Sequence, residues 1–296
     1  MVEYQRSCNA SIYFTVDLED FSYDLCRSLG SSRIPSLRNR SLHKSYLNII
    51  ELLTSNNQYG SKITFFCTGV MADRYPELIR LIAKHGHEVA CHGNFHDDIN
   101  GMTPKEVLKS LQKAKEKLSE VSQTEVKGFR APRFSVDKYD FERLEAISRV
   151  FKYDSSLHFS SDTEFTAWKN ECPINLVEFP VPIQKIISSN FMVKTGGSYL
   201  KLFPAYIVRK AIWKSIESGV TPIVYLHPYD IFYGFDMLAR WSELEGVPLR
   251  WYWYLRQIQW GAAFNWSQKQ KLHSIFAEFK SLGRLDNRLA ENQSNN

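Results

Sequence analysis

Short apolar runs alternate with amphipathic helical patterns along most of this chain, and this alternation is the feature that most constrains its fold. Strands are predicted over residues 11–16, 62–68, 87–91, 126–129, 176–181 and 222–226. Helices are predicted between them, over residues 42–54, 75–85, 141–150 and 205–218 and in a segment that opens at Thr103-Pro104. Strands that alternate with helices indicate an α/β protein with a parallel sheet, either open or closed into a barrel.

The composition changes after about Asp230. Residues 250–260 (RWYWYLRQIQW) are dense in aromatics, which we interpret as packing residues, with stacking on sugar rings as the alternative. Residues 267–283 are predicted to form one amphipathic helix. We therefore expect a main domain over 1–230, an aromatic and helical extension over 231–283 packed on it, and a disordered tail over 284–296.

Charge, cysteine content and hydropathy exclude several classes of protein. The net charge of +5 is spread along 296 residues without a dense basic block, so we expect no nucleic-acid partner. The five cysteines form no CxxC pair, and Cys67 and Cys91 lie in apolar runs, which predicts buried free thiols. We see no basic segment followed by an apolar core at the start and no apolar stretch of membrane-spanning length. A cytoplasmic location is the expectation.

Four polar clusters fall where predicted strands end: TVDLEDF at 15–21, CHGNFHDD at 91–98, GFRAPRF at 128–134 and LHPYD at 226–230. Alone, each is most simply a turn or a helix cap. Because the carboxyl ends of parallel strands meet at one edge of a sheet, the four clusters should lie close together.

His92 and His96 are the residues in these clusters best suited to hold a metal ion. They are four residues apart, and Gly93 between them permits a tight turn after the strand. Two imidazoles and one carboxylate from the 17–20 segment would leave coordination positions open, as in catalytic zinc sites.

The order of the motifs TVDLED, TFF, GHEVACHGNFH, RAP and LHP resembles that of the NodB-homology polysaccharide deacetylases, carbohydrate esterase family 4. Four short segments resemble the branch of this family found with exopolysaccharide gene clusters: YDSSL, EFPV, GGSYLKLFP and YLHPYD. The resemblance covers residues 12–230. It implies a distorted (β/α) barrel and metal-dependent removal of acetyl from an N-acetylated sugar.

The resemblance also implies roles for individual residues. His92 and His96 match the metal-binding histidines of the family, and Asp17 matches its general base. Arg130 matches the arginine that orients that base, and His227 matches the general acid.

One departure leaves the third metal ligand open. The family pattern is TFDDG, whereas Leu18 follows Asp17 here. Glu19 shares strand parity with Asp17, while Asp20 could be the ligand only if the strand breaks first. A second register, with Glu19 as base and Asp20 as ligand, also fits the spacing.

The function expected from this resemblance is hydrolytic de-N-acetylation of a sugar in surface-polysaccharide biosynthesis, with zinc as the cofactor. A cytoplasmic enzyme would meet nucleotide-linked or lipid-linked precursors, and membrane contact is expected only through such a lipid-linked substrate. Two alternatives stay open. One is an allantoinase-like amidohydrolase, with or without metal, that acts on a non-sugar amide or ureide. The other is a glycan-binding relative without catalysis.

Overall fold

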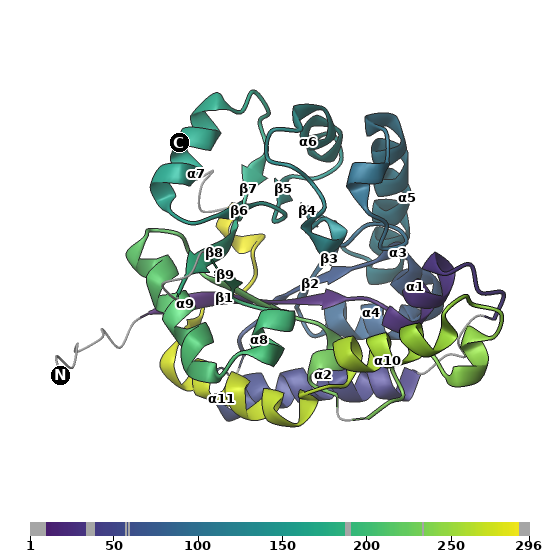
Figure 1. The fold of residues 1–296 in the computed structure, drawn as a ribbon. Helices are drawn as coiled ribbons and strands as arrows, with labels where there is room; N and C mark the ends of the chain where they lie inside the picture. Colours follow the sequence, from purple (N-terminus) through teal and green to yellow (C-terminus); the bar gives the residue numbers. More distant parts are fainter. Residues whose placement is uncertain are drawn as a thin grey trace.

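The computed structural model describes residues 10–33, 39–56, 58, 60–186, 191–232 and 234–289. Its centre is a curled sheet of seven parallel strands, which confirms the predicted α/β fold with a distorted barrel (Figure 1). In spatial order the strands are β10 (Ile223–Leu226), β1 (Ser11–Leu18), β2 (Thr64–Cys67), β3 (Glu88–Cys91), β4 (Gly128–Phe129), β5 (Tyr153–Asp154) and β7 (Val177–Glu178).

The strand register brings the four polar clusters to one level. Leu18 pairs with Cys67, and Cys67 pairs with Cys91, so the residues that follow β1 and β3 leave the sheet side by side. In the same way Cys91 pairs with Phe129, and Val16 pairs with Leu226. The expected meeting of the strand ends at one edge is therefore present in the structure.

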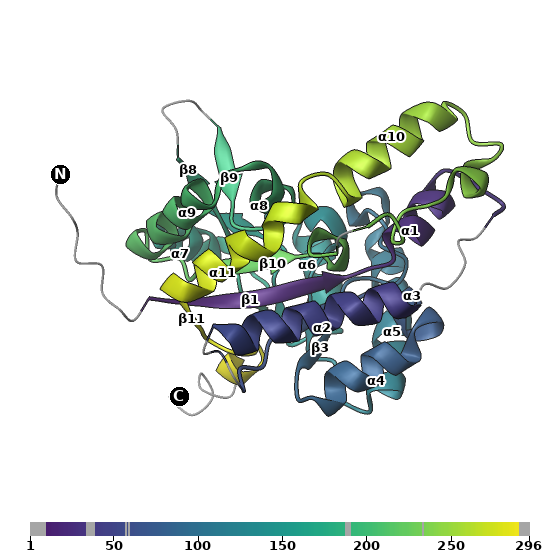
Figure 2. The ribbon, with the colours of Figure 1, turned by 90° about the horizontal axis from the view of Figure 1, so that it is seen from below.

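Helices cover the outer, convex face of the sheet (Figures 1 and 2). Alternate side chains of β1, among them Phe14 and Val16, are fully buried against these helices in the main core. The helices that contribute to this core include α2 (Asn39–Ser55), α4 (Pro76–Lys84), α5 (Pro104–Ser122), α6 (Phe141–Ser148), α9 (Ala205–Glu217) and α11 (Gln268–Glu278).

Side chains of the opposite parity meet inside the curled sheet, where they form a second, smaller core. Tyr13, Phe66, Ala90 and Tyr225 belong to this inner core together with Leu285, which comes from the end of the chain and is fully buried. Asp17 has the same parity as Tyr13, so its side chain also faces inward.

The C-terminal expectations need correction in two places. The predicted helix over 267–283 ends at Glu278, and the chain continues as β11 (Lys280–Ser281), which pairs in parallel with β1. The predicted tail from 284 is wrong for residues 284–289, because Leu285 lies in the inner core and the Asp286 amide donates to Glu88. Residues 290–296 lie outside the described part of the chain.

The predicted strand over 176–181 is divided at Pro180. Its first part is β7, and its second part begins β8 (Val181–Lys185), which forms a separate three-stranded sheet with β6 (His158–Phe159) and β9 (Met192–Lys194). Proline removes a backbone donor, which explains why the strand changes sheets there.

The aromatic segment over 250–260 forms α10 (Arg250–Gly261), which lies at the periphery of the molecule (Figure 2). The expectation of a packing role fails for its outer face, where Trp251, Tyr252 and Leu255 are exposed. Within the described ranges, no helix has the length and apolar character needed to cross a bilayer. Cys67 and Cys91 are buried free thiols as predicted, and Cys8 lies outside the described residues.

Candidate metal centre and active site

Three of the predicted ligands converge where β1 and β3 end. The ligand atoms of Glu19, His92 and His96 all lie within 4.8 Å of one another. Glu19 follows β1 directly, and His92 follows β3 directly, so the strand register places them together. His96 returns to the same point because Gly93 and His96 both adopt left-handed backbone conformations, with φ of +79° and +57°.

The hydrogen bonds of His92 leave one nitrogen free for a metal. Its Nδ1 lies 2.8 Å from the Arg130 carbonyl oxygen. A carbonyl can only accept, so Nδ1 carries the proton and Nε2 keeps its lone pair. Burial lowers the pKa of His92 to about 4, which keeps the ring neutral at physiological pH. Metal-binding histidines commonly have such a backbone carbonyl as their second partner.

Glu19 supplies a buried carboxylate to the same point. Its Oε1 accepts from the Tyr229 hydroxyl at 2.8 Å, and its Oε2 lies 2.6 Å from His96 Nε2. No hydrogen bond of ordinary geometry reaches Oε2 despite this short distance. Burial alone would raise the pKa of Glu19, but His96, followed by His227 and His92, holds it well below its usual range. A carboxylate held ionised beside two imidazoles fits a divalent cation, and the donor set is that of catalytic zinc.

Asp20 does not join this cluster. It is the N-cap of α1 (Phe21–Ser28), where its side chain accepts from the Tyr23 amide, and its other oxygen interacts with Arg74 and Tyr75. The strand does end before Asp20, as a ligand role would require, but the carboxylate is used to start the helix. The geometry therefore favours the register with Asp17 as base and Glu19 as ligand.

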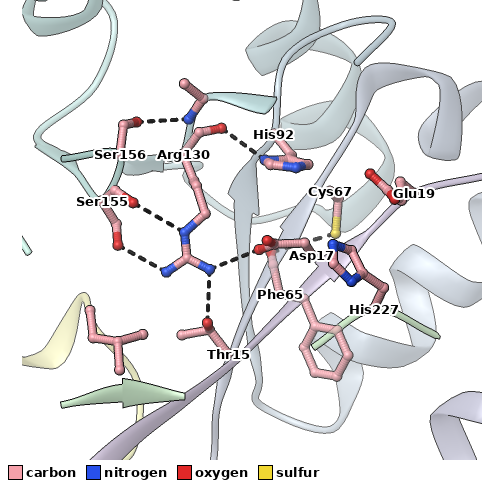
Figure 3. A network of polar contacts seen from close by, with 12 residues as sticks. Thr15, Asp17, Glu19, Phe65, Cys67, His92, Arg130, Ser155, Ser156 and His227 are labelled. Carbon is pink, nitrogen blue, oxygen red and sulfur yellow. Dashed lines mark hydrogen bonds and ion pairs between the residues drawn. The ribbon is translucent and has the colours of Figure 1, made fainter. Parts of the chain in front are cut away.

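Arg130 holds Asp17 at the edge of the cavity. The Arg130 Nη1 lies 2.8 Å from Asp17 Oδ1 and 2.9 Å from the Thr15 hydroxyl. On its other side the guanidinium donates to the carbonyl and the hydroxyl of Ser155, and Figure 3 shows it between these two groups of acceptors. It also stacks on Phe66, with 4.1 Å from Cζ to the ring centroid. Arg130 is fully buried, so this network fixes the direction of the Asp17 carboxylate.

His227 faces the same cavity from the end of β10. Its Nδ1 lies 2.9 Å from Asp230 Oδ2, and its ring stacks on Tyr229 at 4.8 Å. Burial would lower the pKa of His227, but the Asp230 carboxylate outweighs it and raises the pKa to about 9. Lys201, whose ammonium is 3.4 Å from Asp230 Oδ1, stabilises that carboxylate in turn. His227 is therefore held in the protonated form that a general acid requires.

These side chains line a cavity of about 690 Å³. This volume lies within the usual range for small-molecule sites. Asp17, Glu19, His92, His96 and His227 lie on its polar wall, and much of the rest is aromatic: Phe21, Phe134, Tyr199, Tyr225, Tyr229, Trp253 and Trp260.

Asp24 is a cavity residue that the sequence did not reveal. It lies on α1, only 9% of it is exposed, and neither carboxylate oxygen has a hydrogen-bond partner. Burial raises its pKa well above the usual range. Its spacing from Asp20 is that of an ordinary amphipathic helix, so no sequence signal marked it.

Comparison with protein families gives two matches. Residues 44–147 match a model described as Polysaccharide deacetylase, and residues 157–263 match one described as a Domain of unknown function. The first match contains His92, His96 and Arg130, and the second spans the predicted boundary at residue 230. The similarity to polysaccharide deacetylases in this comparison therefore extends over residues 44–147.

Individual proteins show weaker similarity. A peptidoglycan deacetylase of Helicobacter pylori is 28% identical over 210 residues, which are 69% of each chain. The solved structure of the Bacillus subtilis peptidoglycan deacetylase PdaC is 12% identical, with a TM-score of 0.49 and coverage of 97% of this chain and 94% of that one. A family pseudoenzyme from Bacillus anthracis is also 12% identical, with a TM-score of 0.48 and coverage of 94% and 65%.

Proposed function

We propose that this chain is a metal-dependent hydrolase that removes an N-acetyl group from an N-acetylated saccharide in surface-polysaccharide biosynthesis. One observation carries the proposal. A ligand cluster (Glu19, His92, His96), an oriented carboxylate (Asp17) and a protonated imidazole (His227) all line the same cavity. The H. pylori relative, named as a peptidoglycan deacetylase, supports an N-acetylated glycan as the substrate class.

The cluster of Glu19, His92 and His96 would hold the cation, for which we propose zinc because the ligands are two imidazoles and one carboxylate. When bound, the cation supplies Lewis acidity, which polarises an amide carbonyl and makes water more acidic.

Asp17 is assigned the role of general base. It accepts the proton of the attacking water as the new carbon–oxygen bond forms at the acetyl carbon. Arg130 forms an ion pair with the carboxylate and fixes its direction. Because Arg130 is itself held by Ser155, the base has little freedom to turn away from the cavity.

His227 is assigned the role of general acid. When the carbon–nitrogen bond breaks, it protonates the leaving amine of the sugar, and acetate is released. Asp230 holds the Nδ1 proton, so Nε2 is the nitrogen that can deliver its proton into the cavity. Base and acid are thus separate residues with separate supporting partners.

We also propose a cytoplasmic location. The four described cysteines are free, which is usual in a reducing compartment. Fractionation of cells that express the full chain would test this location.

The direct test of the proposed function is acetate release from N-acetylhexosamine oligosaccharides, combined with elemental analysis of the purified chain. We expect near-stoichiometric zinc, activity that a strong chelator abolishes, and recovery when zinc is returned. Acetate release that survives complete metal removal would remove the metal from the mechanism, whereas a chain that contains no divalent metal and releases no acetate would support the amidohydrolase alternative.

A further inference from the structure

The outer face of α10 exposes large apolar side chains, of which Trp251 contacts the Trp241 ring and Tyr252 the Trp253 ring on one side only. Trp251, Tyr252 and Leu255 are 68%, 53% and 60% exposed, and Leu249 just before the helix is 76% exposed. Residues three and four positions apart are neighbours on a helix surface, so Leu255 lies beside both Tyr252 and Trp251 and joins them into one patch. We call these four residues the α10 patch. An exposed apolar patch next to a binding cavity generally marks an interaction surface.

The segment that carries the α10 patch is basic, although Glu243 and Glu245 stand directly before it. Residues 246–277 contain four basic residues, Arg250, Arg256, Lys269 and Lys271, and no aspartate or glutamate. The two arginines belong to α10 itself. The guanidinium of Arg250 lies 3.9 Å from the Trp241 ring centroid, and that of Arg256 lies 4.4 Å from the Trp260 ring centroid. Arg250 donates to the Trp241 carbonyl and Arg256 to the Gln259 side chain, but no carboxylate among the described residues forms an ion pair with either arginine, so neither charge is neutralised there.

This combination matches the surface of an anionic membrane. Tryptophan and tyrosine favour the boundary between lipid headgroups and acyl chains, where one end of the ring is wet and the other is apolar. Helices that lie in this boundary have an apolar face with tryptophan and leucine and basic residues beside it. Arginine adds attraction to anionic headgroups, which an acid-free segment does not oppose.

The other face of the same helix reaches the active site. Trp253 and Trp260 line the cavity that contains Asp17 and His92. We propose that the α10 patch docks this protein onto anionic lipid headgroups, with the mouth of the cavity next to the membrane surface. A saccharide carried on a membrane lipid would then meet the cavity without leaving the bilayer.

Vesicle co-sedimentation of the full chain tests this proposal. We expect binding to vesicles of equal parts phosphatidylglycerol and phosphatidylcholine, weakening as salt screens the arginines, and little binding to phosphatidylcholine alone. The double variant Tyr252→Ser/Leu255→Ser should lower the bound fraction at least about fivefold.

The chain offers a closely matched control. Tyr139 and Leu47 are 55% and 50% exposed and lie away from α10, before α6 and on α2. The variant Tyr139→Ser/Leu47→Ser removes the same side chains at similar exposure, and it should bind vesicles like the unmodified protein. Arg256→Gln should weaken binding and flatten its dependence on salt.

Vesicle binding and the proposed hydrolysis fail independently. Asp17→Asn should bind vesicles normally, because Asp17 lies outside the α10 patch. Tyr252→Ser/Leu255→Ser should still hydrolyse a soluble oligosaccharide, because Tyr252 and Leu255 do not line the cavity. The proposal is overturned if the full chain ignores anionic vesicles, or if the two double variants lose binding equally. If the unmodified protein does not bind vesicles and the α10 variant loses self-association, the patch would be assigned to a second copy of the chain. If the α10 variant instead loses binding to a soluble glycan, the patch would be assigned to a glycan.

Discussion

His87 and His92 flank the same strand, β3, at its two ends, and their nitrogens have different contacts. Both are buried, and burial is the main cause that lowers the pKa of each to about 4. His87 Nδ1 accepts the Ile63 amide at 3.2 Å, which ties the ring into the scaffold. His92 Nδ1 instead donates to the Arg130 carbonyl, and its Nε2 is left for the ligand cluster.

Two buried carboxylates, Glu88 at the amino edge of the sheet and Glu19 at its carboxyl edge, show a similar contrast. Glu88, at the start of β3, is hydrogen-bonded by the hydroxyls of Thr64 and Tyr153. Burial, with the Asp286 charge second, raises its pKa to about 7, whereas imidazoles hold the pKa of Glu19 low. Burial and a perturbed pKa therefore do not identify the site in this protein. What identifies it is the convergence of the ligand atoms of Glu19, His92 and His96 at the carboxyl edge of the sheet.

The largest expected effect separates the two histidines of β3. His92→Ala should remove the bound metal and lower the rate of acetate release by more than about 10³-fold, because a ligand loss exceeds the effect of an ordinary proton-transfer group. His87→Ala should lower the free energy of unfolding but keep stoichiometric metal. Elemental analysis and acetate assays on both variants check this, and equal metal loss in the two would break the comparison.

Asp17→Asn should lower the rate by about 10²–10⁴-fold while metal stays bound, since the amide cannot accept the water's proton. The matched change at the other end of the sheet, Glu88→Gln, should leave the rate per folded molecule close to that of the unmodified protein. Rate measurements on metal-loaded samples of both variants test this. A similar rate loss in both would show that the two carboxyl groups act together.

Leu285→Ala should act on stability alone. The side chain is fully buried in the inner core, and such truncations typically cost about 2–5 kcal/mol. We expect a lower midpoint of chemical unfolding and an unchanged rate for the molecules that remain folded. A selective rate loss without destabilisation would show that the inner core transmits strain to the active site.

The smallest expected effect is a shift of the pH–rate profile. The pKa of His227 is raised to about 9, so the rate should fall as pH rises through that value and the acid loses its proton. The pairing of His227 with Asp230 also stabilises the folded protein. This stabilisation is fully present below pH 6.5, the ordinary pKa of histidine, and it is lost as pH rises through about 9. Asp230→Asn removes the main support for the proton, so the basic limb of the pH–rate profile should move to lower pH.

Much of the site could be predicted from the positions of polar residues at the ends of apolar runs. Asp17, Glu19 and His92 could be placed at one edge because each follows or ends an apolar strand in a parallel sheet. The choice between Glu19 and Asp20 could not be made from sequence. It depends on where the strand ends and the first helix begins, because either carboxylate can bind a metal and only the aspartate is also a preferred N-cap residue.

Other features were hidden because they depend on distant contacts. Leu285 lies in a polar segment, and only its packing inside the curled sheet shows that it belongs to the core. The aromatics of α10 have a composition typical of packing residues, and only their exposure reveals an outer face. Strand β5 is two residues long, too short for any periodic pattern, although its neighbour Ser155 holds Arg130.

The placement of Leu285 and β11 has a consequence for biosynthesis. β1 is translated before its partner β11 and before Leu285, which fills part of the inner core of the curled sheet. Until residue 285 has been translated, the nascent chain exposes part of the apolar inner side of its sheet, the kind of surface that chaperones bind. The inner core is therefore completed only after residue 285 has left the ribosome, and products of termination before that residue lack it.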